Sequence, residues 1–263
     1  MILFTASGAL ASAFSEQYSC KIISARLMRD QELSENIKIA SVIIHNAALI
    51  VSDDLSKLVD DNFGLTKKLV DLSIRINPSV RFINISSMSF LKDEINYMDS
   101  SLMSSYAFSK YLAELYCLKQ SHAICNVRFS TLFYANQKRD GLSNLAYDAV
   151  VKKQITIYND GKAKRDFIPI DIATQYLHKL TGIDILPKIV NIVSGNSIGF
   201  DFFVEKIKAF NSNIKIINIT SETPNVLCSF SKQDIEKLGE IGFSVEEYFE
   251  NYILKLNEST NIQ

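Results

Sequence analysis

A tyrosine followed four residues later by a lysine is the pattern in this sequence with the clearest chemistry. On a helix the two side chains share a face, so the ammonium favours the phenolate and lowers a phenol pKa that is ordinarily about 10. The tyrosine can then act as a general acid or base. The spacing occurs at Tyr106/Lys110, Tyr134/Lys138 and Tyr158/Lys162. Only the first pair opens a convincing helical segment, because the second follows a strand and the third spans an Asn-Asp-Gly turn.

Two further groups lie where strands are expected to end. Ser87 follows an apolar strand, which puts a hydroxyl at the carboxyl edge of a sheet, where a substrate oxygen can be held. The turn after the first strand has Thr5, Gly8 and Ala11 at the spacing of a glycine-rich loop that cradles a dinucleotide pyrophosphate. With one glycine left the motif is weak, and an ordinary tight turn explains it equally well. Thr5 predicts looser contact with the pyrophosphate.

The second strand is followed by a basic residue. Ala25 and Arg26 come after it, and no carboxylate appears before Asp30. An acidic residue there would bind the 2′-hydroxyl of NAD, whereas an arginine accommodates the 2′-phosphate of NADP. The sequence therefore favours NADP(H), with NAD(H) as the alternative. The other interpretation of Arg26 is a solvated loop arginine.

The elements that position these groups alternate along the chain. Short β-branched runs separated by helical segments predict an α/β fold with a parallel sheet and crossover helices. A helix between the second and third strands is expected to be small or missing. We predict a dinucleotide-binding domain over 1–135 and mainly a smaller lobe over 136–263, with 165–195 partly returning to the first domain. The predicted strands are 2–5, 20–24, 41–45, 80–86, 124–129 and 188–193, and the predicted helices include 9–17, 54–76 and 105–120.

Composition narrows the class of protein. The 28 basic and 29 acidic residues are mixed along the 263-residue chain, which argues against nucleic acid and anionic membranes as partners. The apolar opening lacks a positive n-region and is interpreted as a buried strand, and no apolar run reaches the roughly 18 residues of a membrane span. Cys20, Cys117, Cys125 and Cys228 show no metal-binding spacing, so we predict free thiols, no metal and a cytoplasmic location.

Five motifs, in chain order, resemble those of extended short-chain dehydrogenases/reductases. They are His45-Asn46-Ala47-Ala48, Asn62-Phe63-Gly64, Ser86-Ser87, the segment 106–110, and the segment 158–168, which is similar to the "GDG…RDF" stretch of nucleotide-sugar epimerases, dehydratases and reductases. The resemblance covers nearly the whole chain. It implies a Rossmann-like doubly wound parallel sheet, a smaller C-terminal substrate-binding lobe, a nucleotide-sugar substrate, and a homodimer formed through the helices that hold Asn62 and Tyr106.

The resemblance also implies roles for individual residues. Tyr106 would move a proton at the sugar oxygen, Ser87 would hydrogen-bond that oxygen, and Lys110 would bind the nicotinamide ribose. Arg165 would pair with the substrate diphosphate, the alternative being a surface arginine beside Asp160 or Asp166. The implied cofactor contacts are Thr5, Gly8, Ala9, Leu10, Arg26, Asn46, Ala47, Ala48, Asn62, Tyr106 and Lys110, and the implied substrate contacts are Ser87, Met88 and Arg165.

The residues after Ser87 bear on the type of reaction. Family members that resemble 4,6-dehydratases carry an Asp-Glu pair there, and this chain has Met88-Ser89. No cysteine lies nearby to serve the branch that epimerises carbons beside a ketone. We therefore expect an NADPH-dependent 4-ketoreductase of a deoxysugar nucleotide. A 4-epimerase that retains NAD is the first alternative, and a catalytically silent dinucleotide-binding protein is the second.

Overall fold

The computed structural model describes residues 1–93, 96–221 and 230–261, and the chain divides into two compact units. The first unit consists of Met1–Phe129, Thr174–Ile192 and Asp234–Leu238. The second consists of Ser130–Ala173, Val193–Gln233 and Gly239–Gln263. The first unit is therefore built from three separate stretches of the sequence.

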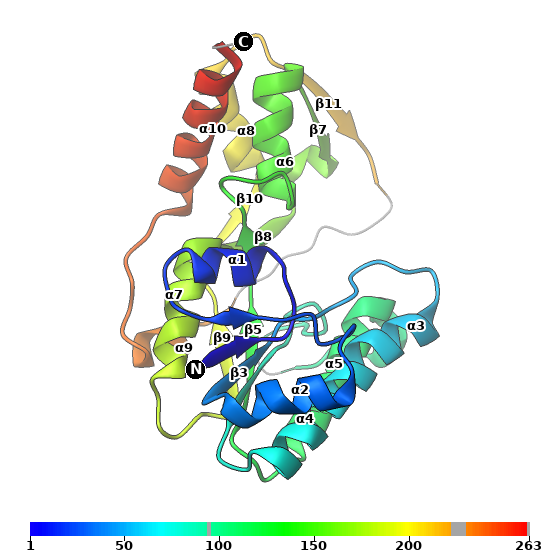
Figure 1. Ribbon diagram of the computed structural model, residues 1–263. Helices are drawn as coiled ribbons and strands as arrows, with labels where there is room; N and C mark the ends of the chain where they lie inside the picture. Colours follow the sequence, from blue (N-terminus) through cyan, green and yellow to red (C-terminus); the bar gives the residue numbers. More distant parts are fainter. Residues whose placement is uncertain (94–95, 222–229, 262–263) are drawn as a thin grey trace. The chain divides into compact units, whose positions relative to one another are not determined.

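A six-stranded sheet forms the centre of the first unit (Figure 1). Its order is β2-β1-β3-β4-β5-β9, and every neighbouring pair is parallel. All six predicted strands are confirmed, with small shifts at their ends. Their β-branched and aromatic residues favour the pleated, buried conformation. The strands are β1 Ile2–Phe4, β2 Lys21–Ile22, β3 Val42–His45, β4 Arg81–Ile85, β5 Ile124–Phe129 and β9 Ile189–Ile192.

The helices of this unit differ from the sequence-based prediction in two places. The ten-residue helix α2, Asp30–Ile39, fills the crossover that was expected to be small or missing. The predicted helix 54–76 is interrupted by a π-helical turn, Asp60–Gly64. The other helices are α1 Ala9–Ser15, α3 Leu55–Val59, α4 Leu65–Ile76, a short 3₁₀ turn Ser100–Leu102, α5 Ser105–Leu118, α7 Ile170–Thr181 and α9 Gln233–Lys237.

Helices cover both faces of the sheet. Leu33 of α2, Leu69 of α4 and Cys117 of α5 share a buried cluster with Leu3 and other strand residues. Phe4, the next residue along β1, points to the opposite face, because successive strand side chains alternate. There it packs on Phe14 of α1 with ring centroids 5.0 Å apart, and Figure 1 shows α7 on the same side as α1. This is the predicted Rossmann-like doubly wound α/β fold.

The second unit has two small sheets and its own aromatic core. One sheet has the order β10-β8-β6, with β10 antiparallel to β8, and the other pairs β11 with β7 in parallel. Phe167, Phe203 and Phe249 lie at the centre of the core. The elements are β6 Thr131–Phe133, α6 Gly141–Tyr147, a π-helical turn Asp148–Lys152, β7 Gln154–Tyr158, a 3₁₀ turn Asn159–Gly161, β8 Lys164–Pro169, β10 Ser197–Gly199, α8 Phe200–Phe210, β11 Lys215–Ile219 and α10 Val245–Asn261.

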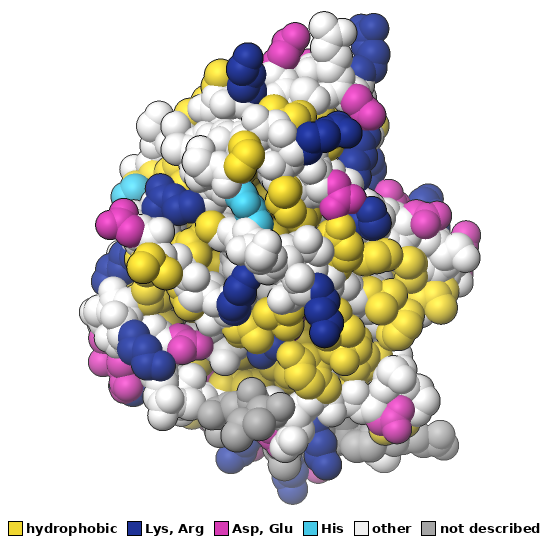
Figure 2. All heavy atoms as spheres, turned by 90° about the horizontal axis from the view of Figure 1, so that it is seen from below, with side chains coloured by type: hydrophobic (Ala, Val, Ile, Leu, Met, Phe, Trp, Pro, Cys, Tyr) yellow, Lys and Arg dark blue, Asp and Glu magenta, His cyan; other side chains and the backbone are white. Residues whose placement is uncertain are grey.

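The surface carries both signs of charge. On the face drawn in Figure 2, lysine and arginine side chains are interspersed with aspartate and glutamate rather than gathered into one field. Within 1–93, 96–221 and 230–261, no helix is long and apolar enough to cross a membrane. Cys20, Cys117 and Cys125 are free thiols, and Cys228 lies outside the described residues.

Candidate active site

Helix α5 carries the tyrosine and the lysine of the predicted catalytic group. Its start is fixed by Ser104, whose hydroxyl accepts the backbone N–H of Ala107 at 3.2 Å. Tyr106 and Lys110 follow in the first two turns, so they lie on one face of the helix. Tyr106 is half-buried and Lys110 is only 2% exposed. The helix therefore presents both groups toward the interior of the first unit, as the spacing predicted.

Ser87 at the end of β4 meets Tyr106. Burial raises the pKa of the Tyr106 phenol, and a hydrogen bond with the Ser87 side chain lowers it to a smaller extent. The expectation of a lowered phenol pKa is therefore wrong for the protein without a ligand, because loss of hydration outweighs the stabilisation of the phenolate. At neutral pH the phenol keeps its proton. That is the form required to donate a proton to a substrate oxygen.

Lys110 is affected by burial in the opposite sense. Burial lowers the pKa of its ammonium to about 8, and the nearby Cys117 and Glu114 act to raise it. Glu114 lies one helical turn beyond Lys110 on the same face. At pH 7 the ammonium is still mainly protonated, because its pKa lies above that pH. Lys110 can therefore supply a positive charge at the site, but that charge is lost as the pH rises through about 8.

The π-helical turn brings Asn62 into contact with α5. Asn62 is fully buried, and its side-chain amide donates to the Ser109 hydroxyl at 2.9 Å and to the Leu49 carbonyl at 2.9 Å. The side-chain oxygen Oδ1 of Asn62 accepts the Leu49 N–H at 2.7 Å, and the Ser109 hydroxyl donates to the Tyr106 carbonyl at 2.8 Å. One side chain thus links the loop after β3 to the backbone of the tyrosine. Such single π-helical turns are often found at functional sites.

In the turn after β1, the Thr5 side chain is part of a buried hydrogen-bond network with His45 and Thr66. Thr5 is buried, and its hydroxyl lies 2.8 Å from Nδ1 of His45, whose Nε2 lies 2.9 Å from the Thr66 hydroxyl. Burial, with further effects of Lys110 and Arg26, lowers the pKa of His45 to about 3, so the imidazole is neutral at pH 7. The Thr5 side chain is committed to this network. Its backbone is paired as well, because its N–H donates to the Ile44 carbonyl at 3.1 Å and its carbonyl accepts the Ala25 N–H at 2.9 Å.

The rest of the predicted dinucleotide-binding turn, from Gly8 into helix α1, leaves space and an uncapped helix N-terminus for a cofactor. No atom lies within 4 Å of the position where a Cβ on Gly8 would stand, so a ligand can approach the backbone closely. Helix α1 begins directly afterwards, and no side chain caps its N-terminus, which includes Ala9 and Leu10. These residues fit a dinucleotide pyrophosphate, because such groups bind at uncapped helix N-termini.

The residues after β3 close the other side of this turn. The Asn46 side chain accepts the Ala6 N–H at 3.0 Å and donates to the Ala6 carbonyl at 2.9 Å. Ala47 packs into the core, whereas Ala48 is half-buried. Asn46 therefore ties the ends of β1 and β3 together, and Ala48 is the more accessible of the two alanines.

Arg26 is exposed and paired. Its Nε lies 3.0 Å from an Asp61 carboxylate oxygen, and its Nη2 donates to the Asp61 carbonyl at 3.4 Å. A 2′-phosphate would have to share or replace this exposed ion pair. Exposed pairs of this kind contribute little free energy, about 0–1 kcal/mol, so the pair does not prevent Arg26 from binding a phosphate.

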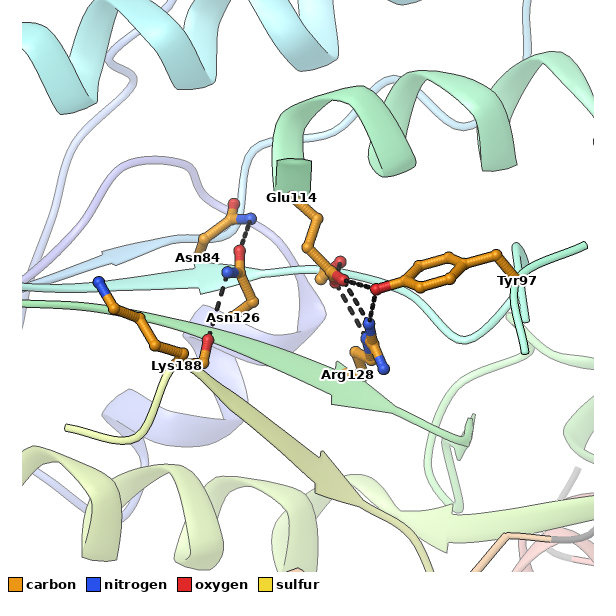
Figure 3. Close-up of polar contacts among 7 residues, drawn as sticks. Asn84, Tyr97, Glu114, Asn126, Arg128 and Lys188 are labelled. Atoms are coloured by element: carbon orange, nitrogen blue, oxygen red, sulfur yellow. Dashed lines mark hydrogen bonds and ion pairs between the residues drawn. The ribbon is translucent and has the colours of Figure 1, made fainter. Parts of the chain in front are cut away.

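A buried ion pair lies next to the predicted catalytic group and was not predicted from the sequence (Figure 3). Glu114 and Arg128 of β5 are 0% and 4% exposed, and Nε of Arg128 donates to the Glu114 carboxylate at 3.0 Å. The same carboxylate accepts the Ser86 hydroxyl at 2.6 Å, and Arg128 also donates to the Tyr97 hydroxyl at 2.9 Å. The cluster joins α5 to the ends of β4 and β5. It therefore fixes the residue that precedes Ser87.

Arg165 belongs to the second unit, where it lines a cavity of about 590 Å³. Within the part of the chain that the structure describes, its guanidinium has no ion-pair partner. Asp166 instead accepts the backbone N–H groups of Ser194 and Gly195 at 2.8 and 2.7 Å, and Asp160 bonds with Asn218. The alternative of an arginine held by Asp160 or Asp166 is therefore not observed.

Two polar residues that line the same cavity were not predicted from the sequence. Asn144 of α6 and Thr156 of β7 line the cavity, and neither side chain is hydrogen-bonded to another described residue. Phe167 and Phe200 supply apolar walls. A concave, largely apolar site with a few free polar groups is the usual form of a small-molecule pocket. No local motif distinguishes Asn144 or Thr156, so the sequence offered no signal for them.

A left-handed turn forms one edge of this cavity. Asn159, Asp160 and Gly161 have φ values of 47°, 58° and 70°, a region that asparagine, aspartate and glycine tolerate best. At Gly161 a Cβ would stand 2.8 Å from the backbone nitrogen of Asp201. Gly161 is therefore required for close packing of the turn on α8. The turn also explains why Tyr158 and Lys162 do not share a helix face.

The doubly wound parallel sheet defines a Rossmann-like α/β protein. In it the Ser87 hydroxyl contacts the Tyr106 phenol, and the buried Lys110 ammonium lies on the same helix as Tyr106. The chain belongs to the NAD dependent epimerase/dehydratase family, whose model matches residues 3–192. This confirms the resemblance predicted from the motifs. No curated protein sequence is significantly similar to the chain.

Solved structures with the same fold match nearly the whole chain. MoeE5 in complex with UDP-glucose and NAD is 18% identical with a TM-score of 0.80, covering 98% of this chain and 99% of that one. RMD from Pseudomonas aeruginosa complexed with NADPH is 14% identical with a TM-score of 0.80, covering 98% and 99%. UDP-glucose 4-epimerase from Thermotoga maritima with UDP-glucose is 15% identical with a TM-score of 0.79, covering 100% and 99%. Proteins of this fold thus include NAD and NADPH complexes.

Proposed function

We propose that this protein is an NADPH-dependent reductase that acts on the 4-keto group of a nucleoside-diphosphate deoxysugar. The observation that carries the proposal is the contact between the Tyr106 phenol and the Ser87 side chain. A keto oxygen needs a proton donor, and burial, which raises the pKa of the phenol, suits Tyr106 to that task. The two residues after Ser87, Met88 and Ser89, offer no carboxylate for elimination of water. Met88 is also buried, so its side chain has little surface to offer a substrate.

The proposed reaction assigns one task to each residue. NADPH, when bound, supplies the hydride that reaches C4 of the sugar. Ser87 donates a hydrogen bond to the keto oxygen and stabilises the charge that develops there. Tyr106 delivers its proton to the same oxygen, and the Lys110 ammonium favours the phenolate that remains. Asn62, through Ser109, holds the backbone of Tyr106 in place.

A 4-epimerase that retains NAD is the second candidate. The specific observation in its favour is Asp61, whose carboxylate lies beside Arg26 at 3.0 Å. Asp61 comes from the π-helical turn Asp60–Gly64, but its contact with Arg26 brings it near the end of β2, where a carboxylate suits the 2′-hydroxyl of NAD. An epimerase returns the hydride to the same sugar, so it shows no net change in the cofactor.

Turnover assays with purified protein test the proposal. NADPH and NADH are each supplied with 4-keto and with 4-hydroxy nucleotide sugars, and both cofactor absorbance and sugar composition are followed. Net oxidation of NADPH with a 4-keto sugar supports the reductase. Interconversion of 4-hydroxy sugars without net cofactor change identifies the epimerase instead, and binding of a dinucleotide without any turnover identifies the silent protein.

The cofactor assignment predicts the effect of Arg26→Asp. The substitution removes the guanidinium and places a carboxylate where a 2′-phosphate would bind, so we expect the ratio of kcat/KM for NADPH to that for NADH to fall by about tenfold or more. Steady-state kinetics with both cofactors measure the ratio. Arg29→Asp, a charge reversal at a nearby exposed loop position, is the matched control. An unchanged ratio for Arg26→Asp removes its role in binding the phosphate.

The substrate assignment predicts the effect of Arg165→Ala. Loss of a charged partner for the diphosphate should raise the KM of the nucleotide sugar by about tenfold or more, with a smaller change in kcat. The control is Lys164→Ala, which removes an exposed positive charge that does not line the cavity. If the KM is the same for both variants and for wild type, Arg165 does not bind the substrate.

A further inference from the structure

Ser89 makes two contacts with the predicted catalytic serine. Its backbone N–H donates to the Ser87 hydroxyl oxygen at 3.1 Å, and the two hydroxyl oxygens lie 2.7 Å apart. Ser89 is exposed, whereas Ser87 is half-buried and contacts Tyr106. Ser89 thus stands on the solvent side of Ser87, and among the described residues its hydrogen bonds are those with Ser87.

The hydrogen-bonding capacity of a serine fixes the direction of these contacts once a ketone is bound. A serine hydroxyl has one hydrogen to donate and two lone pairs that accept. A keto oxygen only accepts, so Ser87 must give it the single hydrogen. The Ser87 oxygen is then left as an acceptor, and its two lone pairs match the two donors that Ser89 offers, its N–H and its O–H.

We propose that Ser89 is a positioning residue that donates both its N–H and its O–H to the Ser87 oxygen and so commits Ser87 to donate toward the keto group. This inference rests on the proposed function and extends it to a residue outside the predicted site. Donation by the Ser89 hydroxyl polarises the Ser87 O–H bond, because hydrogen bonds in a chain strengthen one another. The hydrogen bonds then run from Ser89 through Ser87 to the keto oxygen, which gains negative charge when the hydride adds to C4.

A double-mutant cycle tests whether Ser89 acts through Ser87. Ser89→Ala keeps the N–H and removes the O–H, so we expect kcat for a 4-keto substrate to fall about three- to tenfold, the typical worth of one hydrogen bond, with little change in KM. Ser89→Thr retains the hydroxyl and should restore the wild-type kcat. In a Ser87→Ala background, Ser89→Ala should have no further effect. An undiminished effect in that background, or a wild-type kcat for Ser89→Ala, overturns the proposal.

A measurement without substrate separates this proposal from the proposed function. The protein is labelled with ¹³Cζ-tyrosine, and the Tyr106 resonance is identified as the one that disappears in Tyr106→Phe. We expect Ser89→Ala to displace this resonance at pH 7, Ser89→Thr to leave it in place, and Ser89→Ala to cause no displacement in the Ser87→Ala background. This result stands even if no nucleotide sugar is turned over, in which case the reductase assignment fails alone. An identical resonance in wild type and Ser89→Ala overturns the role of Ser89.

Discussion

Replacement of Tyr106 by phenylalanine is expected to lower kcat by about 10²–10⁴-fold, the usual contribution of a positioned acid or base. The substitution removes one hydroxyl and keeps the ring, so the free energy of unfolding and the affinity for the cofactor should change little. Initial-rate kinetics measure kcat, and fluorescence titration with NADPH and NADH measures the affinity. Both measurements are needed, because weaker binding of the cofactor would also lower the rate and would not indicate loss of a proton donor.

Tyr134→Phe provides a matched control for this experiment. Tyr134 has the same spacing to a lysine, Lys138, but it lies in the second unit directly after strand β6. Its replacement should leave kcat close to that of wild type. The acid role of Tyr106 is wrong if Tyr106→Phe retains turnover within about tenfold of wild type, a difference of roughly 1.4 kcal/mol in the activation barrier.

Glu114→Gln is expected to lower the free energy of unfolding by about 3–5 kcal/mol, because it leaves the Arg128 guanidinium buried without a counter-charge. A guanidinium cannot escape this cost by losing its proton. Arg128 is 4% exposed, so water does not replace the lost carboxylate. Urea denaturation of wild type and variant measures the change, with the dependence on denaturant checked to be equal.

Two further variants separate charge burial from a general loss of packing. Replacing Glu114 and Arg128 together by methionine removes both charges and should recover much of the lost stability. Asp71→Asn removes the charge from the exposed Lys67–Asp71 pair on α4, where the nitrogen and oxygen are 2.6 Å apart. It keeps an oxygen that can accept the Tyr116 hydroxyl, so it should cost no more than about 1 kcal/mol. A Glu114→Gln variant no less stable than Asp71→Asn would contradict a structural role for the buried pair.

The parts of the fold that the sequence predicted correctly depend on local patterns. Most of the strands from Ile2 to Ile192 are short β-branched runs, and the sheet buries the central ones, such as β3 and β5, on both faces, whereas the edge strand β2 is exposed. The helix predicted over 105–120 is likewise observed as α5, Ser105–Leu118. The choice of Tyr106 among three tyrosine–lysine pairs used the same kind of local context, because the other two pairs follow a strand or span a turn. Secondary structure predicted from such local patterns is correct wherever the tertiary contacts favour the same conformation.

The parts that the sequence did not predict depend on contacts between distant residues. Helix α2 has few apolar residues in Asp30–Ile39, so its periodic signal was weak. The π-helical turn at Asp60–Gly64 turns Asn62 inward, and only its partners in α5 and in the loop after β3 reveal why. The raised pKa of Tyr106 follows from burial, which a motif does not report. The Glu114–Arg128 pair likewise joins a helix to a strand.

The three-part makeup of the first unit has a consequence for how the protein is synthesised. When residues 1–129 have left the ribosome, strand β5 still lacks its neighbour β9, because Val127 pairs with Val190. All six residues of β5 are buried in the finished protein, so until then its unpaired backbone forms a sheet edge open to pairing with other chains. The nascent chain must carry this exposed edge through the synthesis of some sixty more residues, the interval in which chaperone protection matters most.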